Sequence, residues 1–157
     1  MGKRILIVVL VLLVVIQFIR PTANTNPQPQ RAALTNFYPV PAHVDAILKK
    51  ACYDCHSNNT RYPWYSKVQP VAWWLQHHVD EGKRELNFDE FGGYTRRRQS
   101  KKMKEVAEQV EKGEMPLDSY TWIHKDAILT PEERSTLISW AKQMEQQAGD
   151  STKPDTD

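Results

Sequence analysis

The 157-residue sequence has only two cysteines, Cys52 and Cys55, and no dominant charge of either sign. Two thiols exclude the structural zinc sites that need three or four sulfur ligands. The formal net charge of +2, with Lys and Arg interleaved among Asp and Glu, favours no nucleic-acid partner, and we expect none. The one basic cluster, Arg96–Arg98 with Lys101 and Lys102, is typical of a solvated start of a helix.

Signals for strands and for common enzyme sites are also missing. No stretch shows sustained alternation of apolar and polar residues, and there is no Asn-Gly hairpin signal and no internal repeat. The chain also lacks a phosphate-cradling glycine loop and an evident arrangement of nucleophile and base. The sequence therefore predicts no sheet.

Apolar residues recur at spacings of three and four in several stretches, which predicts an all-α domain of about four helices. The expected helices cover residues 42–55, 69–85, 97–112 and 131–147. The last has the clearest start, because Thr130 can cap it, Pro131 suits its first turn and Glu133 completes a capping box.

The N-terminus carries an apolar run from Ile5 to Ile19, interrupted only by Gln17 and preceded by Lys3 and Arg4. This layout predicts that residues 1–20 form a signal-anchor in a bacterial inner membrane, with a cleaved signal peptide as the alternative. Basic residues ahead of the run place the following chain in the periplasm or another extracytoplasmic space.

Composition divides the remaining chain into three parts. Residues 21–36 are rich in Thr, Asn, Gln and Pro and predict a polar linker, and residues 148–157 predict a disordered tail. Residues 37–147 are left for the folded domain.

Residues Cys52 to His56 form a C-x-x-C-H motif. On a helical turn, such a motif presents two thiols to the two vinyl groups of a haem, and the histidine imidazole to its iron. We expect covalent, c-type haem attachment through Cys52 and Cys55, with His56 as the proximal ligand. Three alternatives stay open. Zinc would need two more ligands from His or carboxylates, and a thioredoxin-like redox pair would need the motif at the start of a helix that follows a buried strand. A plain disulfide would leave His56 unexplained.

A second axial iron ligand is expected further along the chain. Met115 is our preferred residue, because it offers a thioether in a loop stiffened by Pro116. The alternative is His78, which the helical periodicity places on an apolar face, and His77 and His124 are weaker rivals.

Aromatic side chains are expected to wall the cofactor, because flat rings cover a large apolar area. We name Trp64, Trp74 and Tyr120 as cofactor-binding residues in this role. Ordinary core packing is the alternative role for each of them.

The segment from about Tyr38 to Trp140 resembles a family of small bacterial haem-binding domains related in their motif to monohaem c-type cytochromes. The matching residues are Cys52, Cys55 and His56, Ser57-Asn58-Asn59-Thr60, Tyr62-Pro63-Trp64-Tyr65, Pro70, Trp73, Trp74, His78-Val79, Gly113-Glu114-Met115-Pro116, Tyr120 and His124. The resemblance implies haem binding through the cysteine pair and His56, a helical, cytochrome c-like fold, and an N-terminal membrane segment.

For function, we expect an electron-transfer module rather than an enzyme, with the haem passing single electrons to a membrane or periplasmic redox partner. A peroxidase-like enzyme is the first alternative and would need an open iron position with a base such as His78 above it. A haem or gas sensor with an exchangeable sixth ligand is the second.

Overall fold

The computed structural model describes residues 2–150, which are all-helical, as predicted, with no strand in that range. The α-helices are α1 (Gly2–Ile16), α2 (Leu34–Phe37), α3 (Ala42–Ala51), α4 (Tyr53–His56), α5 (Val71–Glu85), α6 (Arg96–Lys112), α7 (Asp118–Thr121) and α8 (Pro131–Gly149). Three short 3-10 turns lie between them: η1 (Trp64–Lys67), η2 (Phe91–Gly93) and η3 (Lys125–Ala127).

The expected number of about four helices is wrong, because the described residues form eight α-helices. The helix expected over 42–55 is divided at Cys52 into α3 and α4, while the other three expected helices are present as α5, α6 and α8. Helices α2, α4 and α7 have four residues each, and a single turn is too short to show an apolar period.

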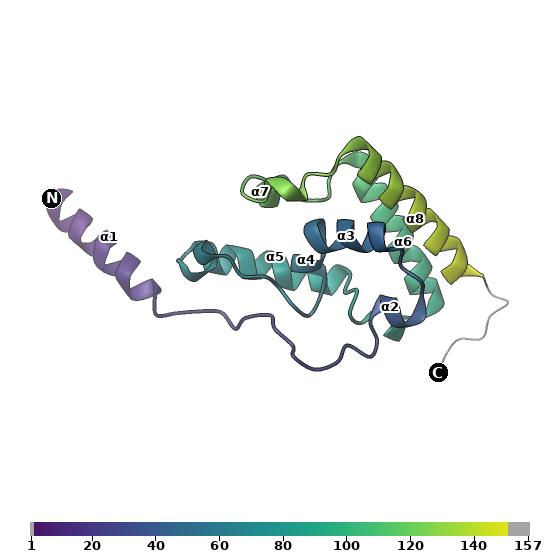
Figure 1. Ribbon diagram of the computed structural model, residues 1–157. Coiled ribbons are helices and arrows are strands. Elements are labelled where there is room, and N and C mark those ends of the chain that lie inside the picture. Colours follow the sequence, from purple (N-terminus) through teal and green to yellow (C-terminus); the bar gives the residue numbers. More distant parts are fainter. Residues whose placement is uncertain (1, 151–157) are drawn as a thin grey trace.

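The core forms where α6 and α8 lie side by side, with α3 packed across them (Figure 1). Met103 of α6, Leu137 and Ala141 of α8, and Leu48 of α3 are fully buried in one apolar cluster. Full burial of a large apolar side chain contributes about 1.5–3 kcal/mol, so this cluster is the main source of stability for the helices that carry the motif.

A capping box starts α8 and also ties it to α3. The hydroxyl of Thr130 accepts from the Glu133 amide at 3.2 Å, and the Glu133 carboxylate accepts from the Thr130 amide at 2.9 Å. Lys50, near the end of α3, forms an ion pair with Glu133 at 2.7 Å. The hydrogen bond from Lys50 is the main cause that holds the pKa of Glu133 below its ordinary value. The end of α3, next to the motif, is thereby fixed to α8.

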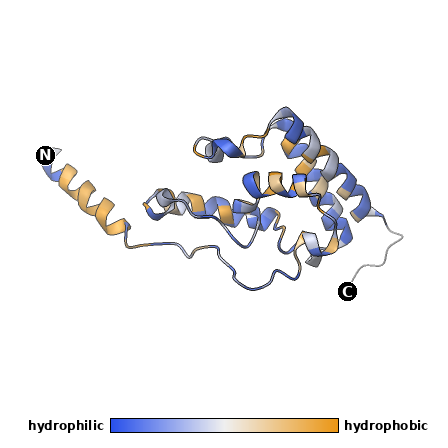
Figure 2. Cartoon of the chain, viewed as in Figure 1, coloured by the Kyte–Doolittle hydropathy of each residue, from blue (hydrophilic) through white to orange (hydrophobic). Residues whose placement is uncertain are grey.

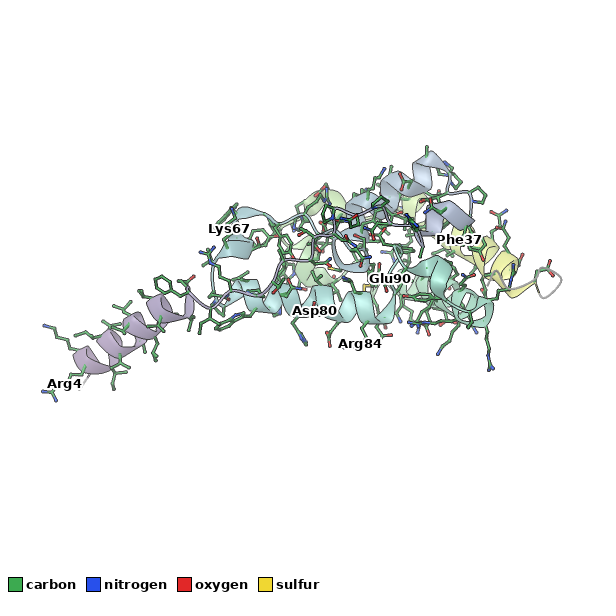
Figure 3. The ribbon with its side chains drawn as sticks, turned by 90° about the horizontal axis from the view of Figure 1, so that it is seen from below. Arg4, Phe37, Lys67, Asp80, Arg84 and Glu90 are labelled. Carbon is green, nitrogen blue, oxygen red and sulfur yellow. The ribbon has the colours of Figure 1, made fainter. Side chains whose placement is uncertain are left out.

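Helix α1 is apolar from Ile5 onward and lies apart from the other helices (Figures 1 and 2). Figure 3 shows Arg4 near its far end, with Lys67 at the nearer end of the domain and Phe37 at the opposite end. Within residues 2–150, no helix combines the length and the apolar content required to cross a membrane.

The expected inner-membrane location, by a single N-terminal span ahead of a periplasmic domain, is therefore wrong, as is the membrane segment in the expected fold. The 15 residues of α1 rise about 22 Å, whereas a bilayer core is about 30 Å thick. The sequence run to Ile19 suggested a longer helix than the one that forms, because the helix ends at Ile16.

The chain between α1 and α2 is irregular and lies along the domain. Gln17 exchanges hydrogen bonds with the backbone of Gln69, and the carbonyl of Ile19 accepts from the side chains of Gln69 and Trp73. The predicted linker over 21–36 and the domain boundaries stay predictions. Most of the predicted tail, residues 151–157, lies outside the described residues.

Asn24 makes several hydrogen bonds between this irregular segment and the domain. Its amide group donates to the carbonyl of Ser57 and to the hydroxyl of Thr60, both at 2.9 Å, and its side-chain oxygen accepts from Lys83 at 2.6 Å. Its backbone N–H donates to the hydroxyl of Tyr62, and its carbonyl accepts from the amide of Thr60. The chain ahead of α2 is thus fixed to the loop that follows α4.

Replacing Asn24 with Ala removes three side-chain hydrogen bonds, two of which have buried partners, Ser57 and Thr60. We expect Asn24→Ala to lower the free energy of unfolding of the full chain by about 1–3 kcal/mol in a urea titration. Asn26→Ala is the matched control, because the Asn26 side chain accepts from the Gln28 amide of its own segment. Equal stability of the two variants would contradict the assignment.

Candidate functional site

The C-x-x-C-H motif occupies the junction between α3 and α4. Cys52 departs from helical geometry, with φ −127° and ψ −46°. Backbone hydrogen bonds nevertheless continue across it, from the Cys52 amide to Leu48 and from the His56 amide to the carbonyl of Cys52, both at 2.9 Å. The two thiols and the imidazole therefore stand on one continuous helical turn, anchored by the buried residues of α3.

A cavity of about 660 Å³ lies beside this turn, within the usual range of about 300–1,000 Å³ for small-molecule sites. It brings together most of the residues predicted as ligands or cofactor contacts. These are Cys52, Cys55, His56, His78, Met115 and Tyr120.

Two predicted contacts do not reach the cavity. Trp64 lies in η1 and is 79% exposed, and Trp74 lies on α5 and is 47% exposed. Neither lines the cavity, whose apolar surface comes instead from residues such as Leu86, Phe88 and Val110. The weaker rivals His77 and His124 are paired elsewhere, with Glu81 and Tyr65 respectively.

The His56 ring is held in one orientation. Its Nδ1 lies 2.9 Å from the carbonyl oxygen of Leu86, and its own carbonyl accepts from the Phe88 amide at 2.8 Å. Because a carbonyl can only accept, Nδ1 carries the hydrogen and Nε2 keeps its lone pair. Burial lowers the pKa of His56, against the opposing effect of the Leu86 hydrogen bond. The neutral imidazole is the form that binds a metal.

Both thiols are protonated at neutral pH. Burial raises the pKa of Cys52 to about 12 and that of Cys55 to about 11, with smaller contributions from the neighbouring Cys55 and Asp54 respectively. A redox pair of the thioredoxin type works with a lowered pKa, so this environment argues against that alternative. Within residues 2–150, no group of three or more His, Cys, Asp and Glu side chains is placed to hold a metal ion.

Helix α5 touches the motif at Gly82. A Cβ built at this position would lie 2.7 Å from the carbonyl oxygen of Cys55 and 3.0 Å from its Cβ. Only hydrogen fits between the two backbones, so the glycine lets α5 pack directly against α4. The sequence analysis missed this residue, because a lone glycine within a helix gives no sign of what it contacts.

Asp54, between the two cysteines, is another residue that the sequence analysis missed. Its carboxylate is buried and accepts from the side chain of Arg61 at 3.0 and 3.1 Å, and from the hydroxyl of Tyr120 at 2.7 Å. Burial, followed by the hydrogen bond to Asp54, raises the pKa of Tyr120. Tyr120 thus meets both the cavity and the motif, in a contact that sequence spacing does not reveal.

The wall opposite the motif comes from α6 and the segment after it. Gly113 takes a left-handed conformation, φ 75°, that ends α6 and turns the chain toward Met115, whose amide donates to the carbonyl of Gln109. Met115 is half-buried against the core. His78, the alternative ligand, is half-buried and has its Nδ1 2.8 Å from the carbonyl of Trp74.

A charged group completes the lining. Lys102 lies between Glu85 at 3.2 Å and Glu105 at 2.7 Å, with its side chain only 13% exposed. The expectation that this lysine belongs to a solvated helix start is therefore wrong, because it lines the cavity and is paired twice. The two carboxylates offset its charge close to the motif.

The cavity of this helical domain presents an oriented imidazole, a thioether and two thiols among apolar side chains. The chain belongs to the haem-binding domain family, whose family model matches residues 11–143. No curated protein and no solved structure matches the chain. Its residues fit a haem, since the imidazole of His56 is oriented by the Leu86 carbonyl and shares one cavity with both thiols. The likeness to cytochromes c stays a prediction.

We expect Gly82→Ala to force α4 and α5 apart and displace Cys55, because the added methyl group meets rigid backbone. Overpacking of this kind costs about 1–3 kcal/mol, which a urea titration measures, and the yield of haem-loaded protein should fall with it. Gly93→Ala is the matched control, since a Cβ there meets nothing within 4 Å. A Gly82→Ala variant as stable as Gly93→Ala would show that the helices are not in this contact.

Proposed function

We propose that this haem-binding protein holds one haem covalently through Cys52 and Cys55 and serves as an electron-transfer module. The observation that carries the proposal is that both thiols, His56 and Met115 line one cavity. Each thiol adds across one vinyl group, with sulfur joining one carbon and hydrogen the other, so the attachment consumes no oxidant or reductant.

In this proposal, His56 and Met115 would bind the iron. The Leu86 carbonyl holds the hydrogen on Nδ1 of His56, so Nε2 would supply the lone pair that binds iron. The bound haem supplies a one-electron couple, and His/Met ligation suits electron-carrying sites. His78 is the alternative sixth ligand, because it lines the same cavity.

The remaining lining residues exclude water and balance charge. Leu86 and Phe88 are buried, and Val110 adds a further apolar surface from α6. The Lys102 pairs with Glu85 and Glu105 leave no unpaired lysine charge beside the iron site. Electron transfer is preferred over chemistry on a substrate, because binding of Met115 to the iron would leave no open position for a substrate.

Covalent attachment is tested by acid-acetone extraction of the full chain, expressed together with a c-type haem maturation system. We expect the unfolded wild type and Met115→Leu to retain haem, and the double variant Cys52→Ala/Cys55→Ala to release all of it. Complete extraction of haem from the wild type would overturn the covalent attachment.

Ligation is tested on the haem-loaded protein by absorption spectroscopy and by the midpoint potential. We expect Met115→Leu to change the low-spin spectrum and to lower the potential, because a Met ligand raises it. His78→Ala should leave both unchanged and serves as the control. The opposite pattern would assign the sixth position to His78.

A further inference from the structure

Asp54 makes contacts that its place in the motif does not require. It is 7% exposed, although it stands between two cysteines on a single helical turn. Its carboxylate accepts from Arg61 in the loop after α4 and from Tyr120 in α7, sixty-six residues along the chain. One side chain therefore joins the attachment motif to two separate parts of the chain.

Arg61 fixes the orientation of this carboxylate. Its Nε donates to one oxygen at 3.0 Å, and its Nη2 donates to the other at 3.1 Å and to the carbonyl of Lys49 at 3.2 Å. Paired contacts of this kind specify geometry. Because the guanidinium is largely exposed, we assign the pair an orienting role rather than a large share of stability.

The segment from Met115 to Tyr120 needs such an attachment. It leaves α6 through the turn at Gly113 and crosses to α7, and a four-residue helix is not stable by itself. Met115, Pro116, Leu117 and Tyr120 all line the cavity. The 2.7 Å hydrogen bond from Tyr120 to Asp54 ties the far end of this segment to the motif.

A second contact, with His124, holds the ring of Tyr120. The ring of His124 stacks on it with centroids 4.3 Å apart, and the hydroxyl of Tyr65 pairs with His124. This contact places the ring, whereas the phenolic hydroxyl itself is used by Asp54.

We propose that Asp54 is a positioning residue that acts through Tyr120 to hold the Met115–Tyr120 segment over the cavity, and so controls access to the sixth coordination position. The proposal rests on the proposed function and extends it, because it explains how the segment with the sixth ligand is kept in place. Asp54 itself touches neither ligand.

The decisive variant is Tyr120→Phe, which keeps the stacked ring and removes only the hydroxyl. In the haem-loaded ferric protein, we expect exogenous imidazole to bind at least about tenfold more tightly than in the wild type, because the segment no longer competes as well for the position. Tyr38→Phe is the matched control, since it removes a phenolic hydrogen bond of 2.6 Å, to Gln99. Equal imidazole affinity in Tyr120→Phe and wild type would overturn the proposal.

Hydrogen exchange on the haem-free chain separates this proposal from covalent attachment. We expect faster exchange of amides in residues 115–122 in Tyr120→Phe and in Asp54→Asn, because Asn has one acceptor oxygen where the carboxylate offers two. Unchanged exchange in both variants would overturn the positioning role even if haem is attached. If both variants exchange faster and the wild type attaches no haem, the positioning role of Asp54 is supported and the covalent attachment of haem is overturned.

Discussion

The direct packing of α4 against α5 at Gly82 is the constraint on which the site depends. It brings the backbone of Cys55 into van der Waals contact with α5. The chain that follows α5 then places the Leu86 carbonyl beside the His56 imidazole and the Phe88 amide beside the His56 carbonyl. The orientation of the imidazole is thus a consequence of how closely two backbones approach. A larger residue at this one position would alter the thiols and the imidazole together.

The rest of the fold keeps this contact in place. The α6–α8 pair forms a platform on which α3 packs, and the Lys50–Glu133 ion pair fixes the end of α3 just before the motif. The same α6 supplies the far wall of the cavity and, through Gly113, the path to Met115. The same helices thus bury the apolar core on one face and line the cavity on another, so that loss of core packing would also widen the cavity.

The longer helices of the domain could be predicted from the sequence, because apolar periodicity is a local signal. The C-x-x-C-H spacing is local too, and it singled out three of the residues that line the cavity. Contacts between residues far apart in the chain could not be predicted from the sequence, because Asp54 contacts Tyr120, and Gly82 contacts Cys55, only after folding. Trp64 was named as a cofactor contact because it is aromatic, and its ring is exposed on η1 and does not line the cavity. The membrane span was wrong because apolar composition does not reveal where α1 ends.

The hydrogen bonds of Asn24 give the N-terminal part of the chain a mechanical connection to the site. Asn24 is bonded to Ser57, the residue directly after His56, and to Thr60, at the end of the same loop. Tension applied along residues 17–23 is therefore transmitted to the loop beside the imidazole before it reaches the apolar core. A pull on α1 would first load the hydrogen bonds of Gln17 and Ile19 to Gln69 and Trp73. The bonds of Asn24 would carry the force next, so that it reaches the loop after the C-x-x-C-H motif.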